Sequence, residues 1–204
     1  MLHYNILAQS QKNLFEIFSD TDFMSDYYLA GGTALALQIG HRMSEDFDFF
    51  SPKDLNSMLL KDDLSKIGEF KISHEEKNTL HCVLNDTKIS FLTFKYKLLN
   101  EIHSEKKIKL CSLKDIACMK LSAIQSRGTK RDFIDFYFLL KKINIQEILQ
   151  DYKNKFGEGN FNLSLIKKSL VFFEDAEPQL MPVMLEKTNW DEIKKALAKI
   201  EKTI

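Results

Sequence analysis

The stretch that decides the fold runs Leu29-Ala-Gly-Gly-Thr-Ala-Leu-Ala-Leu-Gln-Ile-Gly-His-Arg-Met-Ser-Glu-Asp-Phe-Asp-Phe-Phe50. Residues 27–30 form a short apolar run that predicts a strand, Gly31-Gly32 predicts a tight turn, and residues 33–38 predict a short helix. Glycine lets the backbone approach a ligand closely, and the helix behind it directs unpaired N–H groups toward the same space. This turn alone is weak evidence for a ligand site, because many strand-to-helix turns use glycine for steric reasons.

Two aspartates close this stretch in the run Asp46-Phe47-Asp48-Phe49-Phe50, which alternates with the period of a strand. Asp46 and Asp48 then point to the same face, with Cα atoms roughly 6–7 Å apart, while the intervening phenylalanines point into a core. Two carboxylates on one face repel each other, and a divalent cation that prefers oxygen ligands neutralises them well. The alternative interpretation of a lone Asp-x-Asp is an acidic edge strand that faces solvent.

The composition limits the classes of protein to which this chain can belong. The chain has 204 residues, 44% of them hydrophobic, and its 29 Lys and Arg balance 29 Asp and Glu. One domain or two small ones with a real core are expected, whereas a disordered chain or a histone-like polyelectrolyte is excluded. No apolar run reaches membrane-spanning length, the first residues do not resemble a signal peptide, and Cys82, Cys111 and Cys118 form no CxxC pair. We therefore expect buried thiols, a cytoplasmic location and no membrane partner.

The rest of the chain predicts strands first and helices afterwards. We expect helices over residues 3–19 and from Ser51-Pro52 onward, strands over 70–74, 79–84 and 88–94, and a hairpin turn at Asn85-Asp86-Thr87. From about residue 112 only helical patterns remain, and Ser/Thr-x-x-Asp segments that begin at Ser112, Thr129 and Thr188 resemble capping boxes. The predicted organisation is an α/β domain over residues 1–100 and a helical domain over 101–204, with a hinge near 97–111.

A resemblance to a known family follows from these residues. Gly32-Thr33, twelve intervening residues and Asp46-Phe47-Asp48 resemble the signature of the DNA polymerase β-like nucleotidyltransferases, and the whole string from Leu29 to Phe50 resembles the AbiEii/AbiGii toxins of abortive phage infection and toxin–antitoxin pairs. The most specific part is the run of His41, Arg42, Ser44, Asp46 and Asp48. The resemblance implies an α+β fold, in which a nucleotidyltransferase-like mixed β-sheet with flanking helices precedes a C-terminal helical bundle.

The resemblance also implies a site and a reaction. Gly31, Gly32 and Thr33 would cradle a nucleoside triphosphate, Asp46 and Asp48 would hold Mg²⁺ or Mn²⁺, and Arg42 would lie beside the phosphates. The reaction would be in-line transfer of a nucleoside monophosphate with pyrophosphate as leaving group, to an acceptor such as tRNA. A cognate antitoxin would be the protein partner.

One expected residue is missing from the pattern. Nucleotidyltransferases of this fold usually carry a third carboxylate on a later strand, where it helps activate the attacking hydroxyl. The matching strand is Lys88-Ile-Ser-Phe-Leu-Thr-Phe94, and its alternation puts Ser90 in the expected place. Ser90 does not replace a carboxylate as metal ligand or base. A non-catalytic nucleotide- or partner-binding module on the same fold is therefore the alternative function.

A second segment, from Lys120 to Asp135, resembles the same family. Helical spacing places Lys120 and Arg127 on one face, two turns apart. The resemblance implies that Lys120 contacts phosphate, that Arg127 and Arg131 orient phosphates or an RNA backbone, and that Asp132 or Asp135 stands in for the missing carboxylate. The alternatives are structural: Asp132 as a helix cap, Arg131 and Asp135 as a surface i,i+4 pair, and Lys120 as one solvated lysine among many.

The balanced total charge hides local imbalance. Between Glu105 and Arg131, eight basic residues oppose two acidic ones for a net charge of +6, while aspartates and Glu45 gather in the N-terminal half. We expect an acidic metal-binding face and a basic helical face, an arrangement that suits a triphosphate with its metal ion. The basic residues are Lys106, Lys107, Lys109, Lys114, Lys120, Arg127, Lys130 and Arg131.

Overall fold

The computed structural model describes residues 2–100 and 103–204, and it forms two compact units. The sheet unit takes the described residues of Met1–Ile39, Ser44–Lys97 and Glu101–Cys111, and the helical unit takes Gly40–Met43, Leu98–Asn100 and Ser112–Ile204. The boundary predicted at residue 100 therefore differs from the observed division. The chain also enters the helical unit twice before residue 112, which no linear boundary can describe.

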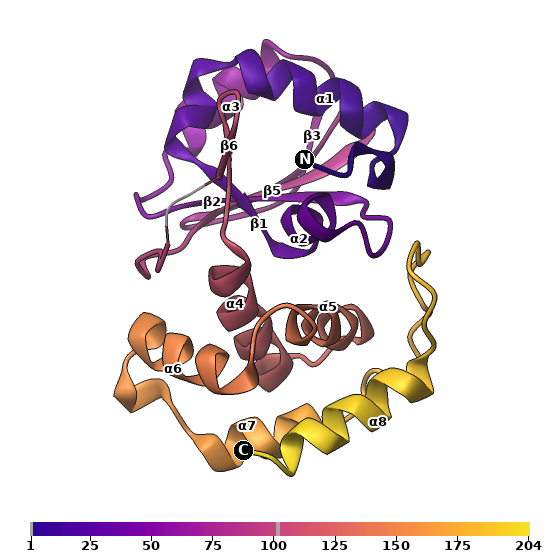
Figure 1. Cartoon of the computed structure of the whole chain (residues 1–204). Helices are drawn as coiled ribbons and strands as arrows, with labels where there is room; N and C mark the ends of the chain where they lie inside the picture. The colour runs from indigo at the N-terminus through magenta and orange to yellow at the C-terminus, as the bar shows by residue number, and fades with distance from the viewer. Residues whose placement is uncertain (1, 101–102) are drawn as a thin grey trace. The chain divides into compact units, whose positions relative to one another are not determined.

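The sheet unit is a seven-stranded mixed sheet with helices against it (Figure 1). The strand order is β3-β4-β5-β2-β1-β7-β6, and β2 runs parallel to β5 and β1 parallel to β7. The remaining strand pairs are antiparallel. The strands are β1 (Tyr28–Ala30), β2 (Asp46–Ser51), β3 (Phe70–Glu76), β4 (Thr79–Leu84), β5 (Thr87–Thr93), β6 (His103–Glu105) and β7 (Ile108–Leu110).

Aromatic side chains fill the core beneath one face of this sheet. Phe49 packs edge-on against Phe18, with ring centroids 5.5 Å apart, and stacks on Phe91 at 5.4 Å. Figure 1 shows α1 and α3 on the same side of the sheet. The helices and 3₁₀ turns of this unit are η1 (Tyr4–Ile6), α1 (Gln9–Asp20), η2 (Asp22–Asp26), α2 (Gly31–Ile39) and α3 (Ser57–Ser65). The α+β architecture predicted from the sequence is confirmed.

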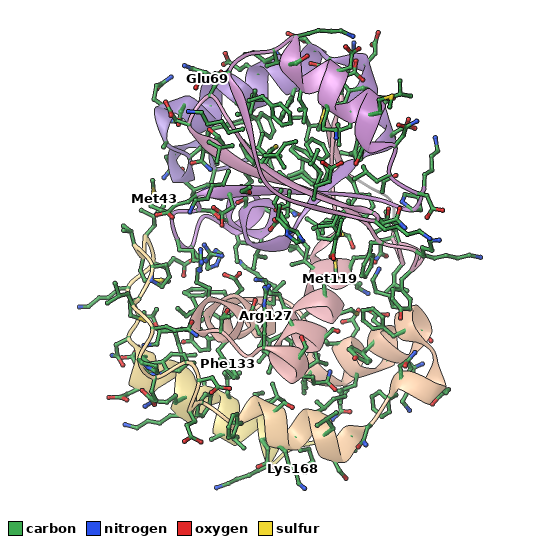
Figure 2. All side chains as sticks on the ribbon, turned by 180° about the vertical axis from the view of Figure 1, so that it is seen from behind. Met43, Glu69, Met119, Arg127, Phe133 and Lys168 are labelled. Atoms are coloured by element: carbon green, nitrogen blue, oxygen red, sulfur yellow. The ribbon has the colours of Figure 1, made fainter. Side chains whose placement is uncertain are left out.

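The helical unit is built around α5, which is buried on most of its circumference. Phe136 and Phe133, which is labelled in Figure 2, are fully buried. Phe133 packs against Phe173 and Trp190 at ring distances of 5.1 and 6.0 Å. No helix of the described residues is long and apolar enough to cross a membrane. The elements are α4 (Leu113–Ser126), α5 (Lys130–Leu140), α6 (Ile145–Phe156), η3 (Glu158–Asn160), α7 (Leu163–Leu170) and α8 (Trp190–Glu201).

Two local predictions were wrong, and two strands were not predicted. Ser51 does not lead into a helix, because it is still the last residue of β2 and pairs with Thr93, and α3 begins only after the N-cap Asn56. The chain passes between the two units at Lys97 and again at Cys111, the ends of the stretch predicted as a hinge, but this stretch also contains β6 and β7, and β7 extends the sheet beyond β1. The cap of α8 is Asn189 and not Thr188, because the Asn189 side chain accepts a hydrogen bond from the Glu192 N–H. The caps predicted at Ser112 and Thr129 are confirmed.

Candidate active site

Asp46 and Asp48 lie on one face of β2, as the alternation predicts. Both carboxylates are half-buried, whereas Phe47 and Phe49 on the opposite face are 0% and 1% exposed. The burial of the two rings fixes the orientation of the strand, because a shift by one residue would expose both rings and bury both charges. The hydrophobic core thus determines where the acidic pair points.

Gly31 brings the start of α2 against Asp48. β1 pairs with β2 so that Ala30 lies opposite Asp48, and the chain turns into α2 at the next residue. Gly31 has φ of +66°, and a Cβ atom built there would lie 2.7 Å from Asp48 Oδ2. The carboxylate therefore occupies the space that any other residue type would fill with its side chain. The first turn of α2, where backbone N–H groups lack helical partners, lies beside this carboxylate.

The Thr33 hydroxyl stabilises the local fold of this site through hydrogen bonds. Thr33 is buried, and its Oγ1 donates to the main-chain oxygen of Asp46 and lies 2.6 Å from Ser44 Oγ. These bonds tie the first turn of α2 to the beginning of β2. The predicted contact between the triphosphate and Gly31, Gly32 and Thr33 stays a prediction, and within it the two glycines are the more accessible residues.

The donor set fits a magnesium or manganese ion. Two carboxylates on one strand face are hard oxygen ligands, and Mg²⁺ in phosphoryl-transfer sites is typically held by one or two carboxylates together with substrate phosphates and water. Among residues 2–100 and 103–204 there is no group of three or more His, Cys, Asp or Glu placed to hold a metal. Asp46 and Asp48 are the carboxylates that would hold such an ion, together with substrate phosphates and water.

Ser90 lies where the sequence predicts, directly beside Asp48. The parallel register of β2 and β5 aligns Asp48 with Ser90, and the hydrogen bond of Ser90 Oγ goes to His81 Nδ1 on β4 at 2.8 Å. The sequence alone does not single out His81. The signal was present: Asn85 and Asp86 form a two-residue turn with φ of +47° and +62°, which sets the antiparallel register and pairs His81 with Ser90.

Asp135 lies at the centre of an ion cluster within the helical unit. It is fully buried, and its carboxylate accepts from Arg42 Nε and Nη2 at 2.7 and 2.8 Å and contacts Lys120 Nζ at 2.6 Å. His41 Nε2 lies 2.8 Å from the same carboxylate. Burial alone would raise the pKa of Asp135, but the charges of Lys120 and Arg42 and the hydrogen bonds hold it well below its usual range. Asp135 is thus not a surface partner of Arg131.

Asp132 extends this cluster and caps α5 at the same time. Its carboxylate contacts Lys120 Nζ at 3.0 Å and Arg127 Nε at 2.9 Å, and it accepts from the Thr129 hydroxyl at 2.6 Å. Burial opposes the ionised form, yet the Lys120 and Arg127 charges outweigh it and lower the pKa of Asp132. The cap that sequence reasoning weighed as an alternative is therefore real, and it coexists with two ion pairs.

His41 and Arg42 join the helical unit through a short excursion of the chain. The segment Gly40–Met43 pairs with residues near Met184: the Met43 N–H donates to Val183 O and the Leu185 N–H donates to His41 O. Burial lowers the pKa of His41 despite the nearby Asp135 carboxylate. The lowered pKa keeps the ring neutral near pH 7. The structure thus gathers Arg42, Lys120, Asp132 and Asp135 in one unit, and Gly31, Asp46, Asp48 and Ser90 in the other.

Several cations of the basic run between residues 105 and 131 have partners within their own unit. Four of them pair with carboxylates and two donate to main-chain carbonyls, which reduces the charge left to attract phosphate. The predicted phosphate contacts of Arg42, Lys120, Arg127 and Arg131 stay predictions. The partners are Asp22 for Lys107, the Ser25 carbonyl for Lys109, Glu147 for Lys114, Asp132 for Lys120 and Arg127, and main-chain carbonyls for Lys130.

The chain is similar to known proteins over most of its length. The chain is 38% identical over 180 residues to the protein aq_aa25 of Aquifex aeolicus (strain VF5), which covers 85% of this chain and 86% of the relative. The crystal structure of JHP933 from Helicobacter pylori matches with a TM-score of 0.57 at 19% identity, over 97% of this chain and 92% of that one. The nucleotidyltransferase toxin MenT4 from Mycobacterium tuberculosis H37Rv matches with a TM-score of 0.54 at 14% identity, over 87% and 74%.

A family model gives the assignment. The model of the nucleotidyl transferase AbiEii toxin, type IV toxin–antitoxin system, matches residues 13–110 and 96–203, and so spans both units. The two solved structures share the fold, and their identities are too low to transfer more than that. The glycine turn, the strand with the two aspartates and the helical segment all lie inside the matched residues, and the chain belongs to the AbiEii nucleotidyl transferase toxin family.

Proposed function

We propose that this chain transfers a nucleoside monophosphate from a nucleoside triphosphate to an acceptor hydroxyl, with pyrophosphate as leaving group. The observation that supports this reaction is the pair Asp46 and Asp48 on one face of β2, with Asp48 packed against Gly31 at the first turn of α2. Carboxylates and unpaired helix N–H groups side by side are what a metal-bound triphosphate requires.

Different residues of the sheet unit bind the metal ion and the phosphates. Asp46 and Asp48 hold Mg²⁺ or Mn²⁺, which supplies the positive charge that neutralises the triphosphate and the departing pyrophosphate. The N–H groups at the start of α2 donate hydrogen bonds to phosphate oxygens. The absence of a side chain at Gly31 leaves room for the Asp48 carboxylate beside these N–H groups. Positioning of the α-phosphate in line with the acceptor lowers the barrier further.

The acceptor and the cellular role form the second part of this proposal. A toxin that transfers nucleotides needs an acceptor essential to the cell, and the terminal hydroxyl of an RNA, tRNA first among them, has the required nucleophile. We therefore assign the chain a toxin role, opposed by a cognate antitoxin. Induction of the wild-type chain in a bacterial host should arrest growth, and Asp48→Asn should not, at equal protein level. Growth arrest by Asp48→Asn would contradict the role of transfer in toxicity.

The reaction is tested with each nucleoside triphosphate labelled at the α-phosphate, Mg²⁺, and total RNA or purified tRNA. Wild type should transfer label, and Asp46→Asn and Asp48→Asn should lose at least about a hundredfold, since both carboxylates act on the metal. Asp54→Asn is the matched control, because Asp54 lies in the same unit but is exposed and paired with Lys95. Absence of transfer by wild type, or equal transfer by the Asp46 and Asp48 variants, would refute the proposal.

A further inference from the structure

A row of polar side chains extends sideways from Asp48 across the sheet. Asp48 is aligned with Ser90 on β5, and Ser90 is aligned with His81 on β4. Side chains of directly paired residues point to the same face, so all three lie on the face of the aspartate pair. Neighbouring strands are about 4.8 Å apart. Ser90 is therefore within reach of a substrate held at Asp48, and His81 lies one strand farther from Asp48, within reach of Ser90.

The hydrogen bond between Ser90 and His81 connects this row chemically. Ser90 Oγ lies 2.8 Å from His81 Nδ1, and both side chains are half-buried. When Nδ1 is the unprotonated nitrogen, the serine hydroxyl donates to it and its oxygen lone pairs remain available on the other side. A hydroxyl in this state can take a proton from a neighbour while it passes its own proton to the imidazole.

A purely structural explanation of this bond has to be weighed against its position. The sheet unit contains a structural hydroxyl pair, Thr33 with Ser44, which is buried and tied to a main-chain carbonyl. The Ser90–His81 pair differs in two respects: it keeps partial exposure, and it lies one strand from the proposed metal-binding carboxylate. A base is needed at that point, because the acceptor hydroxyl must lose its proton as it attacks.

We propose that Ser90 and His81 together accept the proton of the attacking hydroxyl, an inference that rests on the proposed nucleotidyl transfer. The acceptor oxygen forms a bond to the α-phosphorus, and the bond from that phosphorus to the bridging oxygen of the β-phosphate breaks, which releases pyrophosphate. The acceptor proton moves to Ser90 Oγ, the Ser90 proton moves to His81 Nδ1, and the imidazolium later returns a proton to water. Ser90 is the catalytic residue, and His81 acts through it.

Kinetics of the full chain with variants tests this inference. Ser90→Ala and His81→Gln should lower kcat by at least about tenfold, within the range of general-base effects, and leave KM and the affinity for the triphosphate within about twofold. His74→Gln is the matched control, because His74 carries the neighbouring imidazole, 5.7 Å from the His81 ring, and lies one strand beyond it. Equal kcat for wild type and His81→Gln, or a loss confined to KM, would overturn the inference.

A rescue variant separates proton acceptance from structural support. Ser90→Asp places a carboxylate directly beside Asp48, so it should accept the proton without the imidazole. The double variant Ser90→Asp with His81→Gln should then have the kcat of Ser90→Asp alone, whereas His81→Gln in the wild-type background is impaired. An equal loss from His81→Gln in both backgrounds would show that His81 only supports the sheet. Label found on Ser90 itself, by mass spectrometry, would make it an acceptor and also overturn the inference.

The state of the imidazole gives a readout that needs no activity. Nitrogen-15 NMR of the full chain should find His81 Nδ1 unprotonated near pH 7, and Ser90→Ala should shift the Nδ1 resonance. Protonation at Nδ1 would overturn the inference, because the ring could then take no proton from Ser90. If wild type transfers no label to any RNA, the proposed function fails, and this measurement still decides whether Ser90 donates to His81.

Discussion

Replacement of Asp135 by Asn should destabilise the helical unit far more than loss of a surface carboxylate. Asp135 is fully buried with Arg42, Lys120 and His41 around it, and Arg42 is only 3% exposed. Removal of one partner from a buried ion pair costs about 3–5 kcal/mol, because the other charge stays buried without compensation. Lys120 keeps its contact with Asp132, so we expect about 3 kcal/mol, or roughly 10 °C in Tm for a chain of this size.

Urea denaturation followed by tryptophan fluorescence measures this loss. Trp190 is the chain's single tryptophan and packs against Phe133 of α5, so its emission reports the helical unit. Asp62→Asn is the matched control: its pair with Lys66 is exposed at an i,i+4 spacing and should contribute about 0.3–0.5 kcal/mol. A free energy of unfolding for Asp135→Asn within about 1 kcal/mol of this control would refute the argument from buried charge.

A hydrophobic double variant sharpens the same test. Arg42→Met combined with Asp135→Leu removes the charges of both partners, and buried ion pairs replaced by apolar residues of similar volume are often neutral in stability. We expect the double variant to be more stable than Asp135→Asn. A double variant less stable than the single one would show that the guanidinium supports the fold in another way.

Other predictions concern single positions. Gly31→Ala should cost more than 1 kcal/mol and reduce metal affinity, because its Cβ would meet Asp48 Oδ2 at positive φ, whereas Gly159→Ala, with open space around it, should be close to neutral in urea melts. Thr129→Ala should lose about 1 kcal/mol with its N-cap, and Thr188→Ala almost nothing, by the same assay. Folding lowers the pKa of His41, so the neutral ring contributes to the stability of the folded state above the unfolded pKa of about 6.5, and this contribution is lost as pH falls. The free energy of unfolding of wild type should therefore fall more than that of His41→Gln between pH 7 and 5.5.

The two faces of β2 and the hairpin of β4 and β5 could be predicted from the sequence, because each depends on residues that are close in the chain. The alternation of Asp46 to Phe50 fixes its own two faces, and the Asn85-Asp86 turn fixes the register of β4 against β5. The place of Ser90 beside Asp48 followed from the same alternation. These features need only the period of a strand and the geometry of a two-residue turn.

The remaining features depend on contacts between distant residues. Asp135 has the i,i+4 spacing of a surface pair with Arg131, and only the burial of α5 and the arrival of Arg42 from 93 residues away change its environment. The strands β6 and β7 have three residues each, too few to show a period, and pairing with β1 and with each other creates them. Tertiary contacts therefore override local pattern at both places.

The helical unit includes two short segments from before residue 112, Gly40–Met43 and Leu98–Asn100. This division bears on whether either unit can be expressed alone. A fragment that begins at residue 112 would lack His41 and Arg42, and also the N–H groups of Leu99 and Asn100 that donate to the buried carboxylate of Asp115. A sheet fragment with its natural sequence would carry those segments with no partners for them. Neither unit should therefore be an autonomous folding domain, and separate expression should yield aggregation or degradation unless the missing segments are supplied in trans.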